Sequence, residues 1–379
     1  MKLKKLLALL LAMVLCFSVA ACSQSTSDTG TDTSAPSTDD TQNTEEDTSE
    51  TADAPADSGV EPYLGITIFD YSNNFVGYIR NGIDYYIDEL GGMEYLMVDG
   101  ENNQATQTER IDTMISRGVN VLAVNPVDSS AGETIVAKAK EADIPVVFFN
   151  RMPPIEVLNS YDKCWYVGLD SVTEGALQAD LLNEAWTNDQ ATWDVNGDGV
   201  LQYVLVMGTP GHSDAEDRAN GFHDRLAELG TPVEELASEY ANWSTADANE
   251  VVETWIGRYG NQIEMVVCSN DAMALGAVEA LRSNGLITDT SIVPVMGVNA
   301  LPEVSELISS GVMLGTVLTS PYDSARAIVD LCINAANGEE DVTAGTDWTL
   351  EDGKIVRIPE TTITVDNVDV AVEHYKTAN

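Results

Sequence analysis

From Tyr63 onward the chain alternates between two patterns of apolar positions. Short runs such as 63–69 (YLGITIF) and 144–150 (IPVVFFN) are apolar at nearly every position, which is typical of strands buried on both faces. The stretch 73–90 has its apolar residues at helical spacing instead. Buried strands that alternate with helices predict an α/β fold, in which helices cover both faces of a parallel sheet.

This alternation occurs in two successive halves. The first half has predicted strands at 63–69, 93–99, 119–126, 144–150 and 165–170, with helices at 73–90, around 104–117 and near 130–141. The second half has predicted strands at 201–208, 263–270 and 292–299, again with helical stretches between them. Together they span about 320 residues, too many for one compact core, so two α/β domains are expected.

The start of the chain has the composition of an export signal. Three lysines precede the apolar run 6–19, which is too short to span a bilayer comfortably and predicts a cleaved signal over 1–21. The sequence VAAC at 19–22 is similar to a lipobox, the cleavage motif of bacterial lipoproteins, so a lipid is expected on Cys22. An ordinary export signal followed by a chance cysteine is the alternative.

Residues 22–61 predict a disordered acidic tether. Beyond Cys22 they are mostly Ser, Thr, Asp, Glu, Ala, Gln and Pro, without one Lys or Arg. Such a segment buries too little apolar surface to offset its ordering entropy. The protein is therefore expected to be extracytoplasmic, with the lipid anchor as its only attachment to the cell membrane; a binding tail is the weaker reading of the same segment.

The composition and the absence of catalytic motifs favour a small-molecule-binding protein over an enzyme or a nucleic-acid-binding protein. The formal net charge of −44 argues against nucleic acid as a partner. Besides Cys16 and Cys22, the chain has Cys164, Cys268 and Cys332, and no disulfide framework is expected from them. Three histidines, with no serine-hydrolase, nucleotide-binding or zinc-protease motif, indicate that the protein is not an enzyme.

Polar side chains gather where the predicted strands end, at the edge where open α/β sheets bind ligands. Each of them also fits a helix N-cap or a turn. Together they suit a sugar, because hydroxyls pair with amides and charges, and the apolar faces of a pyranose stack on aromatic rings. The set comprises 69–75, Asn125, Asn150, Arg151, His212, Asp214, Arg218, Asn270, Asp271 and Asn299, with Phe75 and Trp243 as aromatic residues.

A second chemical signal is the oxygen-rich stretch 194–202 (DVNGDGVLQ). Its residues Asp194, Asn196, Asp198, Val200 and Gln202 match the first nine positions of an EF-hand loop, with Val200 offering a backbone carbonyl. The bidentate Glu expected at the twelfth position is replaced by a leucine. Spacing alone therefore leaves two interpretations, an incomplete calcium loop or a surface turn between a helix and a strand.

From about residue 62 onward the chain resembles the bacterial periplasmic D-galactose/D-glucose-binding proteins, within the type I periplasmic binding protein superfamily. The resemblance covers nearly the whole mature chain. It rests on NNF at 73–75, IPVVFFN at 144–150, SYDKCWYVGLDS at 160–171, DVNGDGVLQ at 194–202, GTPGHSDAEDR at 208–218, NDAMALGAVEAL at 270–281 and GVNALPE at 297–303.

The resemblance implies roles for particular residues. A distant glutamate, here Glu264, would complete a calcium site with Asp194, Asn196, Asp198, Val200 and Gln202, so calcium is the expected cofactor. Phe75 and Trp243 would stack on the two faces of the sugar. The residues expected to hydrogen-bond its hydroxyls are Asn125, Asn150, His212, Asp214, Arg218 and Asn270.

Three positions depart from the family pattern. Asn73 and Asn299 stand where the family commonly has Asp, and Thr319 stands where it has Asn. A carboxylate accepts strong charge-assisted hydrogen bonds, whereas an amide must donate from one side. The ligand class, a monosaccharide such as galactose or glucose, is therefore better supported than the identity of the sugar.

The implied fold is α/β, with two Rossmann-like lobes joined by a three-strand hinge. The N-terminal lobe would comprise 62–169 with 319–354, and the C-terminal lobe 170–318 with 355–379, with crossings near 169–170, 318–321 and 353–355. A monomer is expected that closes on its sugar and delivers it to the permease of an ABC importer. The alternatives are a sugar-sensing lipoprotein for a chemoreceptor or kinase and, less favoured, a calcium-dependent carbohydrate hydrolase.

Overall fold

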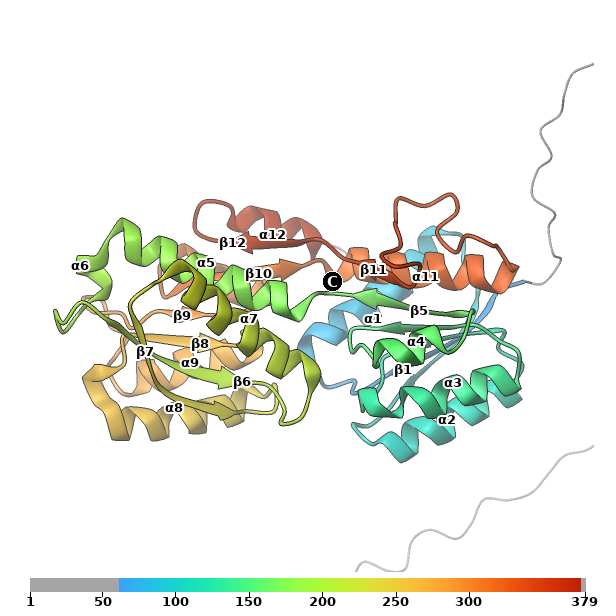
Figure 1. Cartoon of the computed structure of the whole chain (residues 1–379), viewed down its shortest axis with the longest axis horizontal. Coiled ribbons are helices and arrows are strands. Elements are labelled where there is room, and N and C mark those ends of the chain that lie inside the picture. The colour runs from blue at the N-terminus through green and yellow to red at the C-terminus, as the bar shows by residue number, and fades with distance from the viewer. Residues whose placement is uncertain (1–60, 376–379) are drawn as a thin grey trace, which may run out of the picture. The chain divides into compact units, whose positions relative to one another are not determined.

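The computed structural model describes residues 61–375. The expected export signal, Cys22 and all of the tether except Glu61 lie outside the described residues. The described chain contains two six-stranded sheets, each covered by helices, and these sheets define the two lobes (Figure 1). All strand pairs are parallel except β10 with β12.

The first sheet has the strand order β11-β5-β4-β3-β1-β2. Its strands are β1 (Tyr63–Ile68), β2 (Glu94–Asp99), β3 (Val121–Val124), β4 (Val146–Phe149), β5 (Cys164–Gly168) and β11 (Ile355–Arg357). The helices of this lobe are α1 (Asn74–Glu89), α2 (Gln104–Ser116), η1 (Ser129–Ala131), α3 (Gly132–Glu141), α4 (Ile155–Asn159) and α11 (Pro321–Asn337). Although α11 is remote in sequence, it packs beside α1 and against β3, β4 and β5.

The second sheet has the order β12-β10-β9-β8-β6-β7. Its strands are β6 (Leu201–Met207), β7 (Val233–Tyr240), β8 (Met265–Cys268), β9 (Val295–Met296), β10 (Met313–Thr319) and β12 (Glu360–Ile363). Its helices are α5 (Ser171–Asn188), α6 (Gln190–Trp193), α7 (Ser213–Leu229), α8 (Thr245–Tyr259), η2 (Gly260–Gln262), α9 (Asp271–Ser283), η3 (Pro302–Val304), α10 (Ser305–Ser309) and α12 (Val368–His374).

The central strands form the cores. Every residue of β3, β4 and β8 is buried, as their continuous apolar sequences predict. Each fully buried Val, Leu, Ile or Phe contributes about 1.5–3 kcal/mol relative to an exposed one. The three cysteines of the described chain, Cys164, Cys268 and Cys332, are buried free thiols within this packing.

The chain passes between the sheets three times. It leaves β5 for α5, leaves β10 for α11, and leaves β11 for β12. The last crossing was expected at 353–355, and that position is wrong because β11 pairs with β5 through Ile355–Tyr166, Val356–Val167 and Arg357–Gly168. Residues 355–357 therefore belong to the first sheet, and the crossing lies around Pro359, which has no backbone N–H for a ladder.

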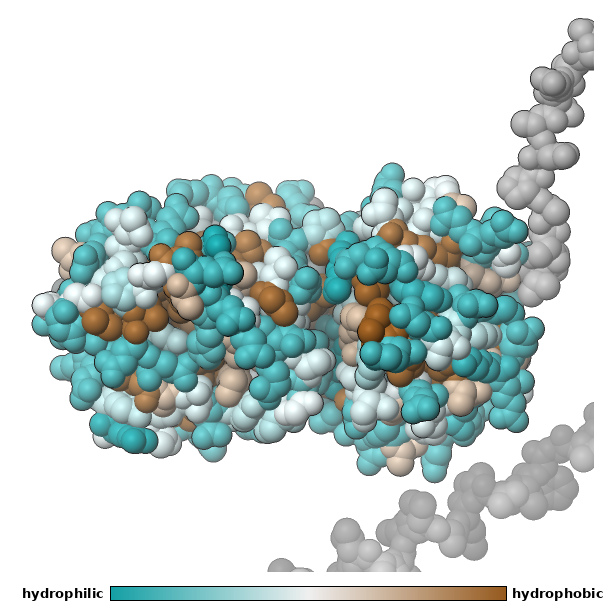
Figure 2. Space-filling model, in the orientation of Figure 1, coloured by the Kyte–Doolittle hydropathy of each residue, from teal (hydrophilic) through white to brown (hydrophobic). Residues whose placement is uncertain are grey.

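Few large hydrophobic side chains of the described chain are exposed. Within 61–375 no helix combines the length and the apolar composition needed to cross a bilayer. Figure 2 shows hydrophilic residues over most of the visible face, with smaller hydrophobic areas between them.

Candidate ligand-binding site

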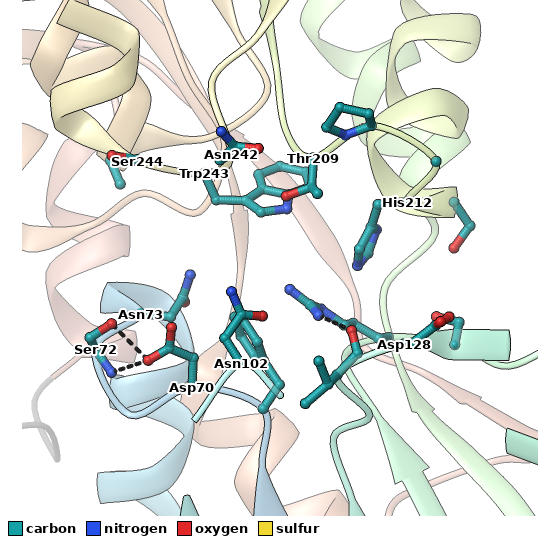
Figure 3. A pocket seen from close by; sticks show the side chains of 18 of the residues that line it. Asp70, Ser72, Asn73, Asn102, Asp128, Thr209, His212, Asn242, Trp243 and Ser244 are labelled. Carbon is teal, nitrogen blue, oxygen red and sulfur yellow. Dashed lines mark hydrogen bonds between the residues drawn. The ribbon is translucent and has the colours of Figure 1, made fainter. Parts of the chain in front are cut away.

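Two adjoining cavities lie at the carboxyl ends of the strands, where both lobes contribute. The outer cavity has a volume of about 760 Å³. A smaller inner cavity of about 50 Å³ adjoins it. The two share the lining residues Phe69, Asn73, Arg151, His212 and Trp243. Figure 3 shows side chains of the first lobe, such as Asn73, facing Trp243 and His212 of the second.

Most of the residues expected to bind the sugar line the inner cavity. They are Asn73, Phe75, Asn150, His212, Asp214, Arg218, Trp243, Asn270 and Asn299. The two expected aromatic rings thus meet in one cavity, although they are far apart in sequence. Of the eleven expected positions, Asn125 and Thr319 line neither the inner nor the outer cavity.

Helix capping explains how several of these polar side chains reach the cavity. Asn73, His212 and Asn270 directly precede α1, α7 and α9 and accept hydrogen bonds from backbone N–H groups of those helices. The capping interpretation and the binding interpretation are therefore compatible. In Asn73, Oδ1 accepts from the Val76 N–H at 3.1 Å, so its NH₂ group remains available to a ligand.

Trp243 is held in the site by backbone geometry. Its own φ is +59°, and its ring packs against the His212 imidazole with 5.7 Å between the ring centroids and an interplanar angle of 80°. A Cβ on Gly208 would come within 2.1 Å of the indole. Glycine at 208 is therefore needed for the ring to lie where it does.

Arg218 is a buried cation that other protein groups hold in place. Its Nε donates to Glu174 Oε2 at 2.9 Å, its Nη2 pairs with the same oxygen, and its Nη1 donates to the Ser269 carbonyl at 2.5 Å. Glu174 is fully buried and also accepts from the Thr319 hydroxyl at 3.0 Å. Burial alone would raise the pKa of Glu174, and the adjacent guanidinium opposes that rise.

His212 offers the ligand a neutral imidazole. Its Nδ1 accepts from the Asp214 N–H at 3.2 Å, which places the ring proton on Nε2. Burial lowers the pKa of His212 to about 3, and the positive charges of Arg151 and Arg218 add to the effect. Nε2 is buried without a partner in the described chain, so its N–H is free to donate to a ligand oxygen.

Arg151 was noted at a strand end but assigned no role, and the structure places it in both cavities. Its guanidinium carbon lies 3.6 Å from the ring centroid of Phe69, and Nη1 donates to the Val127 carbonyl at 2.5 Å. Burial lowers its pKa to about 10, while the charge of Asp214 acts in the opposite direction. Its position directly after Asn150 is the sequence signal that pointed to it.

Asn125 and Thr319 act behind the cavity. Asn125 is fully buried; its Oδ1 accepts from Phe69 N at 3.3 Å, and its Nδ2 donates to Asn150 Oδ1 and to the Phe149 carbonyl, each at 3.2 Å. It therefore orients Asn150, whose backbone has a φ of +61°. The Thr319 hydroxyl is likewise directed to Glu174 rather than to the cavity.

The comparisons with known proteins agree with the observed fold. The family model described as a periplasmic binding protein domain matches residues 64–340. This chain belongs to the periplasmic binding protein family. It has the two-lobed α/β fold of the type I members.

Relatives of this periplasmic binding protein carry names that describe small polyhydroxylated ligands. It is 39% identical over 316 residues to the D-galactose/methyl-galactoside binding periplasmic protein of Haemophilus influenzae, covering 83% of this chain and 93% of that one. It is 28% identical over 317 residues to the xylitol-binding protein of Mycolicibacterium smegmatis, covering 83% and 80%. An ABC transporter solute binding protein of Bacillus halodurans with bound myo-inositol matches with a TM-score of 0.69 at 25% identity, over 83% and 98%.

The oxygen-rich loop of this periplasmic binding protein is folded around Glu264. Oε1 of Glu264 accepts from Val195 N at 2.7 Å and from Asn196 N at 3.2 Å, and Oε2 accepts from Gln202 N at 3.0 Å. Asp194 accepts from Asp198 N at 3.0 Å and from Gly199 N at 2.9 Å. The structure thus places Glu264 in hydrogen-bond contact with the backbone of the oxygen-rich loop.

The chemistry of this loop fits a hard cation. Its side-chain donors are three carboxylates and two amide oxygens, and one backbone carbonyl would join them. Within 61–375 no three His, Cys, Asp or Glu side chains are gathered closely enough to hold a metal by themselves. Any cation here therefore depends on the amide and carbonyl oxygens as well. Gly197 and Gly199 supply the positive φ values, +76° and +83°, that the tight turn requires.

Proposed function

We propose that this protein is an extracytoplasmic receptor for a monosaccharide of the galactose or glucose type, which it delivers to an ABC importer. The inner cavity carries the proposal, because two aromatic rings and a set of amides, a neutral imidazole, a carboxylate and two guanidinium groups line one small space. Flat apolar rings suit the faces of a pyranose, and the polar groups suit its hydroxyls. The names of the relatives support the same ligand class.

Lobe closure is the proposed mechanism. Asn73, Phe75 and Asn150 belong to the first lobe, whereas His212 and Trp243 belong to the second. A sugar that contacts both sets stabilises the closed arrangement, because that arrangement alone provides every contact. A permease would then recognise the closed form and accept the sugar. The receptor binds and releases the sugar without changing it.

We further propose that calcium occupies the oxygen-rich loop, held by Asp194, Asn196, Asp198, Gln202, Glu264 and the Val200 carbonyl. The ion would neutralise the carboxylates of Asp194, Asp198 and Glu264 and would tie the loop to the residue that precedes β8. Its role is to stabilise the second lobe, since none of these residues lines either ligand cavity.

The lipid anchor on Cys22 is part of the same proposal. In cells that express the full chain, Cys22→Ser should release the protein from the membrane fraction while Cys164→Ser leaves it there. A wild-type protein without lipid at Cys22 by mass spectrometry would contradict the anchor.

Calorimetry with glucose, galactose, xylose, arabinose and ribose tests the binding function. We expect one hexose to bind most tightly, and Trp243→Ala to weaken that binding by roughly tenfold or more through loss of stacked area. Trp255→Ala, a change at a remote tryptophan of α8, is the matched control. Unchanged affinity in Trp243→Ala would contradict the proposed site. Recovery of a chemically altered sugar would show that the protein is an enzyme rather than a receptor.

A further inference from the structure

Asn150 and Asn299, two of the asparagines that line the inner cavity, have uncommon backbone conformations in equivalent places of the two sheets. Asn150 directly follows β4 and has a φ of +61°, whereas Asn299 lies just beyond β9 and has a φ of +110°. Ala300 follows with a φ of +56°. Positive φ values in non-glycine residues are unfavourable and persist only where the surrounding structure holds them. Both backbones therefore need restraints.

The same pair of hydrogen bonds holds both backbones. The N–H of each asparagine donates to a carbonyl of the neighbouring strand, which is β5 for Asn150 at 3.2 Å and β10 for Asn299 at 2.7 Å. The carbonyl of Asn150 accepts from the Tyr166 hydroxyl at 2.9 Å. The carbonyl of Asn299 accepts from the Tyr375 hydroxyl at 2.7 Å. Each lobe thus uses one tyrosine to fix the peptide group that follows a cavity asparagine.

The two tyrosines come from different elements, and each is fixed by its surroundings. Tyr166 lies in β5, and a Cβ on Gly168 would come within 2.1 Å of its hydroxyl, so the hydroxyl fills space that this glycine leaves open. Tyr375 directly follows α12, and the ring of Tyr78 packs against it edge to face with 4.8 Å between the centroids. Both tyrosines are buried, and burial raises the pKa of each hydroxyl well above its usual range, so each remains a donor.

The two asparagines differ in how their side chains are held. Asn125 Nδ2 donates to Asn150 Oδ1 at 3.2 Å, which orients that amide independently of its backbone. Among the described residues, none makes a hydrogen bond to the side-chain amide of Asn299. The direction of the Asn299 amide in the cavity therefore follows from its backbone. We expect Tyr375 to control Asn299 more strongly than Tyr166 controls Asn150.

We propose that Tyr375 and Tyr166 are positioning residues for sugar binding, which act through Asn299 and Asn150 without touching the ligand. Neither tyrosine lines the inner or the outer cavity. Loss of the Tyr375 hydroxyl leaves the carbonyl of Asn299, a buried residue, without its donor, which is unfavourable. That peptide group then turns toward another donor and carries the Asn299 amide out of its place in the cavity. The inference rests on the proposed function, because it requires a sugar among these side chains.

Changes of tyrosine to phenylalanine test the two hydroxyls, because each change removes one hydrogen bond and keeps the ring. Calorimetry with the sugar that wild type binds most tightly should show binding about tenfold weaker for Tyr375→Phe and about threefold weaker for Tyr166→Phe. Tyr259→Phe is the matched control, since its hydroxyl donates to the Leu236 carbonyl at 2.7 Å in the second lobe, outside both cavities. It should bind within about twofold of wild type, although it loses an equivalent hydrogen bond.

Double-mutant cycles separate positioning from a general structural loss. Asn299→Ala alone should weaken binding by roughly tenfold, which calorimetry still measures. Added to Asn299→Ala, Tyr375→Phe should change the affinity by less than about twofold, because the amide that it positions is gone. Tyr166→Phe should likewise lose its effect in the presence of Asn150→Ala.

The outcomes separate this inference from the proposed function. If wild type binds a sugar and Tyr375→Phe binds it equally well, the positioning role of Tyr375 is wrong and the receptor stands. Equal weakening by Tyr375→Phe with and without the Asn299 amide, or unchanged affinity in Asn299→Ala, would also overturn that role. The same results in the Asn150 cycle would overturn the role of Tyr166. If wild type binds none of the five sugars, the proposed function fails, and the positioning roles fail with it.

Discussion

Glu360 accepts a hydrogen bond from the backbone N–H of Asp170, with 2.7 Å between Oε1 and the nitrogen. Asp170 begins the segment after the first crossing between the lobes, and Glu360 begins the segment after the third. The second oxygen of Glu360 is buried without a partner in the described chain. Glu174, paired with Arg218 and Thr319, adds a negative charge nearby. The hinge thus holds a carboxyl group that is costly to ionise.

The first prediction concerns pH and stability. Burial, with the charge of Glu174, raises the pKa of Glu360 to about 8. A carboxyl with a raised pKa binds its proton more tightly in the folded than in the unfolded state. Its stabilising contribution is therefore complete below the unfolded pKa, near 4.5, and is lost as pH rises through 8.

Urea unfolding between pH 5 and 9 measures this contribution. One such group lowers the free energy of unfolding by about 1.4 kcal/mol per pH unit within the window. Glu360→Gln keeps an uncharged acceptor and should flatten that part of the profile relative to wild type, whereas exposed Glu253→Gln should not. Parallel profiles for Glu360→Gln and wild type would show that Glu360 does not titrate there.

The second prediction concerns Gly208. An added methyl group would meet the Trp243 indole at 2.1 Å, so Gly208→Ala should displace the ring from the inner cavity. We expect sugar affinity to fall by roughly tenfold or more, as in Trp243→Ala, because the same stacked area is lost. Calorimetry measures the affinity, and Gly257→Ala, with open space around its Cβ position, is the control. Normal binding by Gly208→Ala would contradict the assigned place of the indole.

The third prediction concerns the sugar that Asn73 selects. Aspartate is as good an N-cap as asparagine, so Asn73→Asp should keep the hydrogen bond to Val76 N and the start of α1. It would replace the NH₂ group that faces the cavity by a carboxylate oxygen. We expect tighter binding of galactose or glucose by about tenfold, since charge-assisted hydrogen bonds are roughly twice as strong as neutral ones.

Asn103→Asp, a change at the N-cap of α2, is its control, because that residue caps a helix without lining either cavity. Calorimetry against the same five sugars distinguishes a general effect from a selective one. Weaker binding of every sugar by Asn73→Asp would show that the site prefers a donor at this position.

The fourth prediction concerns calcium. Chelation should lower the melting temperature by several degrees, and calcium should restore it, because a ligand that binds only the folded state stabilises it. Asp194→Asn and Glu264→Gln should reduce the response to calcium. Asp189→Asn, a carboxylate near the loop but outside it, should retain the response. A melting temperature that changes with neither chelator nor calcium would contradict the proposed calcium site in the second lobe.

The apolar pattern predicted the central strands because they are buried on both faces. Residues such as Val121 and Val146 have no alternative to a core position, so their strands could be read directly. The pattern did not show β7, whose sequence VEELASEY is half exposed at a sheet edge. It also missed β10, β11 and β12. β7 and β12 lie at sheet edges and expose part of their side chains, so their apolar signal is weaker. β10 is buried at every position except Leu314, so exposure does not explain why it was missed.

The chemistry of the site was partly visible in the chain and partly not. Amides and aromatic rings after strands indicated a sugar site, and the resemblance to a family assigned them roles. Asn125 looked equivalent to Asn150 in sequence, yet the fold uses it to hold Asn150 in place. Glu174 gave no signal at all, since a glutamate in the first turn of a helix is ordinary there.

Local sequence therefore established the fold class, the oxygen-rich loop and most of the residues around the inner cavity, because helix capping and strand burial depend on near neighbours. The place of the last crossing and the pairing of Glu174 with Arg218 depend on segments far apart along the chain. Their contacts and burial are created only when the two sheets assemble, and no residue carries that information alone.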